Sequence, residues 1–161
     1  MPMRYAAGMS VVMQILYRVR KIVFRTFRVR TRGAKVMVFN PAGELLLIRN
    51  SYGRTHLYVL PGGGIGRRET PEAAAAREVK EEVGLDVTGL VRVSEHFNGA
   101  EGKRDTIFLF AAKADGAPTI DNMEVEEAGF FTLDRLPEYI SNATLRRIAE
   151  YRGERTPDGR W

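Results

Sequence analysis

The feature that most constrains this chain is a glycine-rich segment followed by a helix crowded with glutamates. Residues 62–64 are three consecutive glycines, and Glu78, Glu81 and Glu82 fall in the last turns of the helical stretch that follows. At about 100° per residue these three carboxylates share one face of a helix. Like charges at that spacing repel, and acids near a helix C-terminus oppose its dipole. Folding alone therefore does not explain the cluster, whereas a bound cation would.

The sequence also marks both ends of this helix. Thr70 is a favourable N-cap, and Pro71 suits the first helical position, where its missing N–H costs nothing. Gly84 provides the matching stop signal. The helix between them is predicted to have about 13 residues, and the alanines at 73–76 give it a slim surface for packing on a sheet.

The residue types in this segment indicate phosphate chemistry with a metal. Carboxylate oxygens are the ligands that Mg²⁺ or Mn²⁺ prefers, and glycines let backbone groups approach a ligand closely. Backbone N–H groups at a helix start can face phosphate oxygens. A metal between carboxylates and a diphosphate polarises phosphorus and lowers the pKa of an attacking water. The sequence therefore suggests hydrolysis of a phosphoanhydride.

The same residues resemble a known family. Gly63, five residues, Glu69, seven residues and then the run Arg77-Glu-Val-Lys-Glu-Glu-Val-Gly-Leu85 match in full the Nudix hydrolase signature, G-x5-E-x7-R-E-U-x-E-E-x-G-U with U apolar. The segments 56–64 and 129–137 also resemble the family, so the likeness covers about residues 33–140. It implies an α/β fold, a Nudix-type α/β/α sandwich with a mixed β-sheet. It also implies hydrolysis of a nucleoside diphosphate linked to another group.

The resemblance assigns roles by position in the motif. It implies that Glu81 and Glu82 are metal ligands and that Glu78 is a further ligand or the base that takes a proton from water. It also implies that Gly62 or Gly63 offers a carbonyl to the metal. The expected ion is Mg²⁺, with Mn²⁺ able to substitute.

Two other pairs of residues lie in the motif. One pair is expected to stabilise the loop, and the other is a candidate for contact with the substrate. Arg77 and Glu69 are expected to pair and hold the loop on the helix, and Glu69 is a candidate further ligand. Arg67 and Arg68 depart from the neutral or acidic loop tip common in relatives. They either contact a phosphorylated substrate or form a solvated loop.

Three residues outside the signature are further candidates for substrate contact. Tyr58 either stacks on a base or belongs to the core. Glu124 and Glu127 lie in an acidic stretch of the kind from which relatives often supply an extra catalytic or metal-binding acid.

The rest of the chain reads as one domain with a basic extension. Residues 1–32 are predicted to be an N-terminal extension, 33–153 the Nudix domain and 154–161 a flexible tail. Alternation and turn residues predict strands at 35–40, 44–49, 56–60, 87–93, 106–112 and 129–132, and a C-terminal helix at 142–151.

The excess of basic over acidic residues lies at the N-terminal end of the chain. Residues 1–43 contain nine Lys or Arg and no acid, which leaves 16 basic against 20 acidic residues after them. Within the N-terminal extension, residues 10–28 predict an amphipathic helix, with helical spacing of Val12, Ile15, Leu16, Val19, Ile22, Val23 and Phe27. Four roles are open for this predicted helix. It is expected to pack on the domain, to close a homodimer, to adsorb to an anionic membrane or to contact nucleic acid.

These patterns together favour a metal-dependent pyrophosphohydrolase acting on a small nucleotide substrate, such as a nucleotide sugar, a nucleoside triphosphate or a dinucleotide. The alternatives are a non-catalytic ligand-binding module of the same fold, recruited to a membrane or a partner, and a pyrophosphohydrolase of RNA 5′ ends. There is no cysteine, so disulfides, thiolate metal sites and cysteine nucleophiles are excluded. The composition and the lack of a long apolar run are typical of a cytoplasmic protein.

Overall fold

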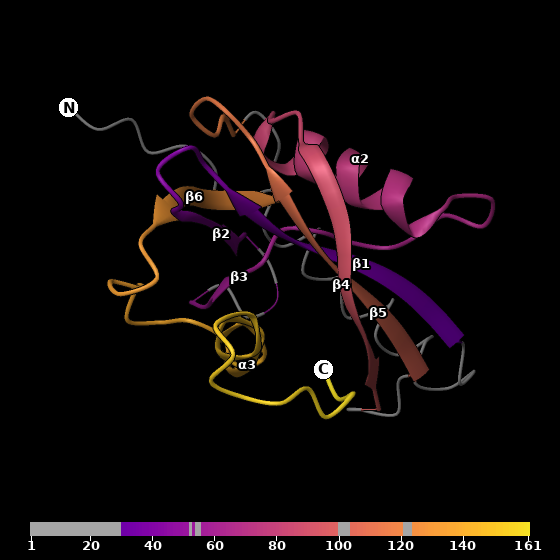
Figure 1. Cartoon of the computed structure of the whole chain (residues 1–161). Coiled ribbons are helices and arrows are strands. Elements are labelled where there is room, and N and C mark those ends of the chain that lie inside the picture. Colours follow the sequence, from indigo (N-terminus) through magenta and orange to yellow (C-terminus); the bar gives the residue numbers. More distant parts are fainter. Residues whose placement is uncertain (1–29, 52, 54–55, 100–103, 121–123) are drawn as a thin grey trace.

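The computed structural model describes residues 30–51, 53, 56–99, 104–120 and 124–161 (Figure 1). Its elements, with the labels of Figure 1, are β1 Arg30–Phe39, β2 Leu45–Asn50, β3 Tyr58–Val59, α2 Pro71–Val83, β4 Thr88–Asn98, β5 Arg104–Lys113, β6 Val125–Phe131 and α3 Asn142–Tyr151. The predicted basic helix at 10–28 lies outside the described residues, so its dimer, membrane and nucleic-acid contacts stay predictions. No helix in the described ranges is long and apolar enough to cross a bilayer.

The strands form one mixed sheet, which confirms the predicted fold class. Along the sheet the order is β3-β2-β1-β5-β4, and β6 pairs with β2. β1 and β5 run parallel over ten registered pairs, whereas every other strand pairing is antiparallel. β1 starts at Arg30, three residues before the predicted domain boundary, so part of the assumed extension belongs to the sheet.

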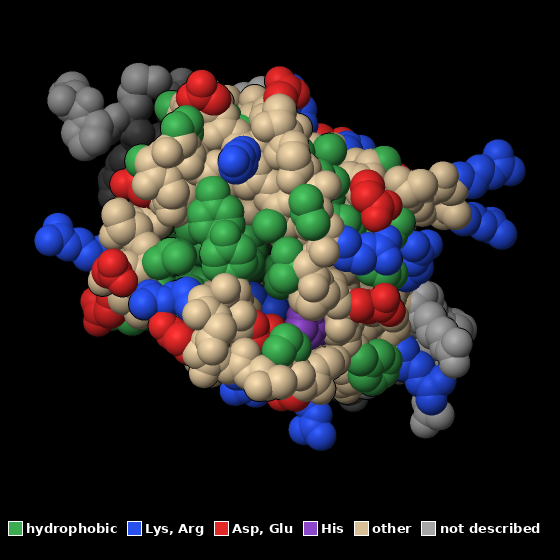
Figure 2. All heavy atoms as spheres, viewed as in Figure 1, with side chains coloured by type: hydrophobic (Ala, Val, Ile, Leu, Met, Phe, Trp, Pro, Cys, Tyr) green, Lys and Arg blue, Asp and Glu red, His purple; other side chains and the backbone are tan. Residues whose placement is uncertain are grey.

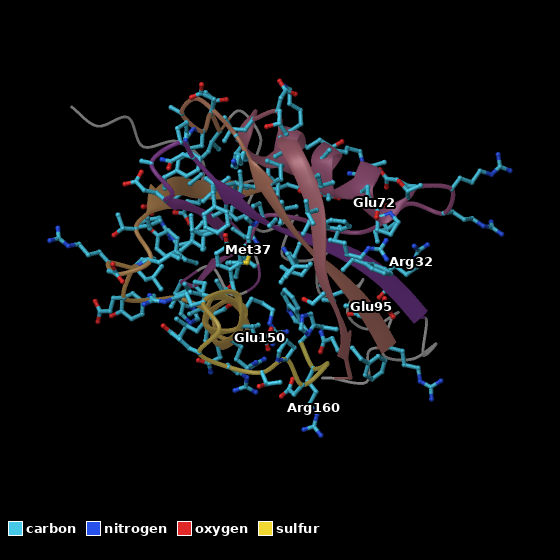
Figure 3. The ribbon with its side chains drawn as sticks, viewed as in Figure 1. Arg32, Met37, Glu72, Glu95, Glu150 and Arg160 are labelled. Atoms are coloured by element: carbon cyan, nitrogen blue, oxygen red, sulfur yellow. The ribbon has the colours of Figure 1, made fainter. Side chains whose placement is uncertain are left out.

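Helices α2 and α3 pack on opposite faces of the sheet, and successive side chains of β1 alternate between these two faces. Ala34, Val36 and Val38 join the core cluster that contains the alanines and valines of α2. Met37, on the other face, joins the cluster that contains Ile148 of α3. Figure 3 shows Met37 in the region between the sheet and α3, and Figure 2 shows hydrophobic side chains gathered on this side of the molecule.

The boundaries predicted for α2 are confirmed. Thr70 is the N-cap, and its hydroxyl accepts a hydrogen bond from the N–H of Ala73 at 3.2 Å. Gly84 ends the helix with φ +70°, and its N–H donates to the carbonyl of Lys80. Thr70 fixes where the helix starts and Gly84 fixes where it ends. The start determines which helix residues face the loop before it.

Residues 154–161, expected to be a flexible tail, make specific contacts with β4. The N–H of Trp161 donates to the carbonyl of Phe97 at 3.0 Å, and the N–H of Phe97 donates to the carbonyl of Gly159 at 2.7 Å. Beneath this pairing, the fully buried Arg147 donates to the carbonyl of Arg160 at 2.8 Å. His96 is also buried there. Figure 3 shows Arg160 and Glu150 on this side of the molecule.

Candidate active site

The glycine loop between β3 and α2 lies directly against β1. The N–H of Ala34 donates to the carbonyl of Gly63 at 2.9 Å, and the N–H of Val36 donates to the carbonyl of Pro61 at 3.0 Å. The approach is closest at Gly62, where an added Cβ would lie 2.1 Å from the carbonyl oxygen of Ala34. Gly62 also has φ +127°, which L side chains rarely adopt. The sequence therefore needs glycine here for both space and conformation.

Glu82 reaches from α2 to this loop. Its Oε2 accepts a hydrogen bond from the N–H of Gly62 at 2.7 Å, and its side chain is buried. Burial raises the pKa of Glu82 to about 7, although the positive charge of Lys35 and the Gly62 hydrogen bond act in the opposite direction. A carboxyl group that titrates near neutral pH is suited to accepting and releasing protons.

Glu78 fits into a space that a glycine leaves open. An added Cβ at Gly63 would lie 2.6 Å from Glu78 Oε2, so any larger residue there would displace the carboxylate. Burial raises the pKa of Glu78, and the neighbouring guanidinium of Arg77 opposes that rise. Glu81, by contrast, is largely exposed on the same helix face. The three glutamates thus differ in their access to water.

Arg77 contacts four groups, two on its own helix and two on the loop. Its Nε and Nη2 donate to Glu69 at 2.8 and 3.0 Å, so the predicted pair is present. Its Nη1 donates to both Glu78 and Glu81 at 2.9 Å, and its Nη2 donates to the carbonyl of Gly64 at 3.0 Å. The guanidinium lowers the pKa of Glu69 to about 2, so this carboxylate stays ionised at neutral pH. Arg77 therefore fixes the loop relative to the glutamates.

Lys35 belongs to the site, although the sequence analysis counted it only as a strand residue. Its Nζ donates to the carbonyls of Leu60 and Gly62 at 3.0 and 2.5 Å. Burial lowers the pKa of Lys35, and the charges of Glu82 and Glu78 oppose that shift. The available signal was a lysine directly before the apolar run at residues 36–39. Sequence spacing could not show that the loop passes close to that lysine.

The remaining residues that the sequence predicted for substrate contact are divided among β3, β6 and the loops before β6 and α2. Tyr58 and Glu127 form a 2.5 Å hydrogen bond with each other, and Glu127 also pairs with Arg49 on β2. The charge of Glu124 makes a minor contribution to the raised pKa of Glu82. Arg67 and Arg68 are exposed at the tip of the loop before α2, and Figure 2 shows basic side chains projecting on that side of the molecule.

The donors in the site are oxygen atoms of the kind that hard divalent cations bind. Within the described ranges, no three acidic or histidine side chains converge closely enough to form a ready-made metal centre. Arg77 already contacts Glu78, and Glu82 is turned toward the N–H of Gly62. The carbonyl of Gly62 nevertheless accepts from a cation, the ammonium of Lys35. The residues therefore fit a divalent ion by donor type and by charge, with these two basic side chains as its competitors.

The burial of Glu82 gives the metal-free protein an expected pH dependence. Its folded pKa of about 7 lies above the ordinary 4.5, so the folded protein binds more protons than the unfolded chain between these values. The free energy of unfolding is therefore expected to fall as the pH rises through this window, by roughly 2–3 kcal/mol, and to stay lower above it. Urea titrations of chelator-treated protein at about pH 5 and about pH 8 measure this change.

The same titrations on Glu82→Gln isolate the contribution of this carboxyl group, because other titrating groups are common to both proteins. The wild type is expected to lose stability relative to the variant at the higher pH. A difference between the two proteins that is the same at both pH values would contradict a raised pKa at Glu82.

Comparison with known protein sequences places these residues in a family. The model of the NUDIX domain matches residues 29–151. NAD-capped RNA hydrolase NudC of Vibrio vulnificus is 31% identical over 107 residues, which cover 65% of this chain and 40% of that protein. A putative 8-oxo-dGTP diphosphatase of Bacillus subtilis is 26% identical, with coverage of 76% and 80%. The chain thus spans less than half the length of the first relative and most of the second.

Solved structures agree with this placement. The MutT NUDIX hydrolase of Burkholderia pseudomallei superposes with a TM-score of 0.65 at 26% identity, over 74% of this chain and 96% of that chain. A UDP-X diphosphatase superposes with a TM-score of 0.59 at 21% identity, over 87% and 72%, and shows the shared fold. The family model covers the sheet, the glycine loop and both helices. The chain belongs to the Nudix family.

Proposed function

We propose that this chain is a metal-dependent pyrophosphohydrolase that cleaves a phosphoanhydride bond in a nucleoside diphosphate linked to a further group. The observation that carries the proposal is the contact between Glu82 and the N–H of Gly62, which brings a buried carboxylate with a raised pKa to the glycine loop. Glu78 lies beside the same loop at Gly63. Partly desolvated carboxylates with raised pKa values are typical of catalytic sites, which supports an enzyme over a binding module.

Mg²⁺ or Mn²⁺ is the proposed metal, held by Glu81 and Glu82 with the carbonyl of Gly62 or Gly63. When bound, such an ion neutralises charge on the phosphates and lowers the pKa of a water molecule.

The side chains of the protein perform the remaining tasks in this proposal. Glu78, whose pKa is raised by burial, accepts a proton from the attacking water at its carboxylate. Arg77 holds Glu78 and Glu81 in place and ties them to Gly64 on the loop. The glycines of the loop leave room for phosphate oxygens to approach the backbone.

The relatives support a nucleotide substrate without choosing one. By their names, they act on NAD-capped RNA and on 8-oxo-dGTP, both of which contain a phosphoanhydride next to a nucleoside. Isopentenyl-diphosphate Delta-isomerase of Streptomyces griseus is 36% identical over 70% of this chain, and its name describes a reaction of another type. The intact glutamate cluster beside an ordered loop supports hydrolysis here.

A product screen tests this proposal. Purified protein is incubated with Mg²⁺ or Mn²⁺ and with ADP-ribose, nucleotide sugars, nucleoside triphosphates, dinucleoside polyphosphates and NAD-capped RNA, and the products are separated by chromatography. We expect turnover of one class that stops when the metal is chelated. Metal binding without turnover of any class would favour a non-catalytic Nudix module.

A further inference from the structure

Lys35 makes contacts that the proposed hydrolysis does not account for. It lies on β1, and its Nζ donates to the carbonyl of Leu60 at 3.0 Å and to the carbonyl of Gly62 at 2.5 Å. These two oxygens belong to the segment that enters the glycine loop, so one ammonium spans that entry. The carbonyl of Gly62 is also one of the two proposed to bind the metal.

Gly62 connects Lys35 to the glutamate cluster. Its carbonyl accepts from Lys35, while its N–H donates to Glu82 Oε2 at 2.7 Å. Both polar groups of this one residue are therefore used, one by a cation and the other by a carboxylate. Burial lowers the pKa of Lys35, and the charges of Glu82 and Glu78 act in the opposite direction, in favour of its ammonium form. The lysine thus stands in the electrostatic field that a divalent cation would experience.

From this arrangement we propose that Lys35 is a resident counter-cation of the glutamate cluster, a positioning residue that holds the Gly62 carbonyl and lowers the affinity of the site for divalent metal. The inference rests on the proposed metal-dependent function. Two cations near the same carboxylates repel each other, and the repulsion is strong where water is partly excluded. Lys35 therefore keeps the loop and Glu82 in place before the metal binds, and makes the metal easier to release.

Direct binding of Mn²⁺, without substrate, tests this proposal. The concentration of free Mn²⁺ is followed by electron paramagnetic resonance for the wild type, Lys35→Met and Lys35→Arg. We expect Lys35→Met to bind Mn²⁺ about tenfold more tightly, because a positive charge has been removed from beside the carboxylates. Lys35→Arg retains the charge and is expected to stay within about threefold of the wild type.

Lys113→Met is the matched control, since it removes the same charge from the last residue of β5, whereas Lys35 lies in the middle of the parallel β1–β5 pair. Lys113 is exposed and registers with Phe39, whereas Lys35 registers with Leu109. The control is expected to bind Mn²⁺ like the wild type. Thermal melting of each variant checks that it is folded.

The outcomes separate the two proposals. Wild-type affinity or weaker binding in folded Lys35→Met would overturn the role of Lys35 while leaving the metal site intact. Tighter binding in both Lys35→Met and Lys113→Met would also overturn it, because the effect would then come from net charge. No Mn²⁺ binding by the wild type would overturn the metal site and this inference together.

Discussion

Glu82→Gln is expected to reduce kcat/KM by about 10³-fold, the scale of losing a group that acts on proton transfer or on charge in the transition state. The substitution removes the charge, but it preserves the size of the side chain and an oxygen that accepts from the N–H of Gly62. Because burial already disfavours the charged form of Glu82, the variant should be at least as stable as the wild type. Steady-state kinetics together with thermal melting therefore separates a loss of chemistry from a loss of fold.

Glu72→Gln is the matched control for this variant. Glu72 is an exposed glutamate in the first turn of the same helix, where it pairs with Arg92. Figure 3 labels it on α2, beside Arg32 of β1 in this view. The control should keep kcat/KM within about threefold of the wild type, as expected for an exposed ion pair. A Glu82→Gln protein with the activity of the control would mean that the buried carboxylate has no part in the reaction.

Gly62→Ala is expected to lower the free energy of unfolding by about 3–5 kcal/mol, a size reserved for strained or clashing sites. The added Cβ would meet the carbonyl oxygen of Ala34 at 2.1 Å, and the backbone carbon of that carbonyl at 3.0 Å. Neither atom can move without disturbing β1. The residue would also have to adopt φ +127°. Activity should fall as well, because the N–H that contacts Glu82 would be displaced.

Gly64→Ala provides the contrast two residues along the same loop. No atom lies within 4 Å of the position that an added Cβ would take there, so the change in stability should stay within about 0.5 kcal/mol. Urea denaturation of the two variants and the wild type measures both effects. Equal stabilities for Gly62→Ala and Gly64→Ala would contradict the close passage of the loop along β1.

The prediction of α2 from the sequence was successful because its determinants are local. Thr70 and Pro71 at the start and Gly84 at the end act through their own backbone geometry, so a single sequence carries the whole signal. The Nudix signature is equally local, and the family assignment that it predicted is confirmed. The roles of individual glutamates stay predictions, since they depend on a bound ion and substrate.

The parts that the sequence analysis missed depend on contacts between distant segments. Lys35 meets the loop about 25 residues later in the chain, and Arg147 meets His96 across 51 residues. Hydrophobic periodicity and secondary-structure propensity indicate which face of a helix or strand a residue occupies. They do not indicate which other segment of the chain packs against that face. The contacts of the C-terminal residues with Phe97 were missed for the same reason.

Hydrolysis in water labelled with oxygen-18 tests most directly the central claim, which is that water attacks a phosphorus atom of the substrate. A substrate identified by the screen is hydrolysed in a single turnover in labelled water with Mg²⁺. The masses of the products are then measured by mass spectrometry. The account predicts one labelled oxygen in a phosphate group of one product. Within the time that the wild type needs for one turnover, it predicts almost no labelled product from Glu82→Gln or after chelation of the metal. Products that carry no label, or an isomerised substrate with its phosphoanhydride intact, would contradict attack by water at phosphorus.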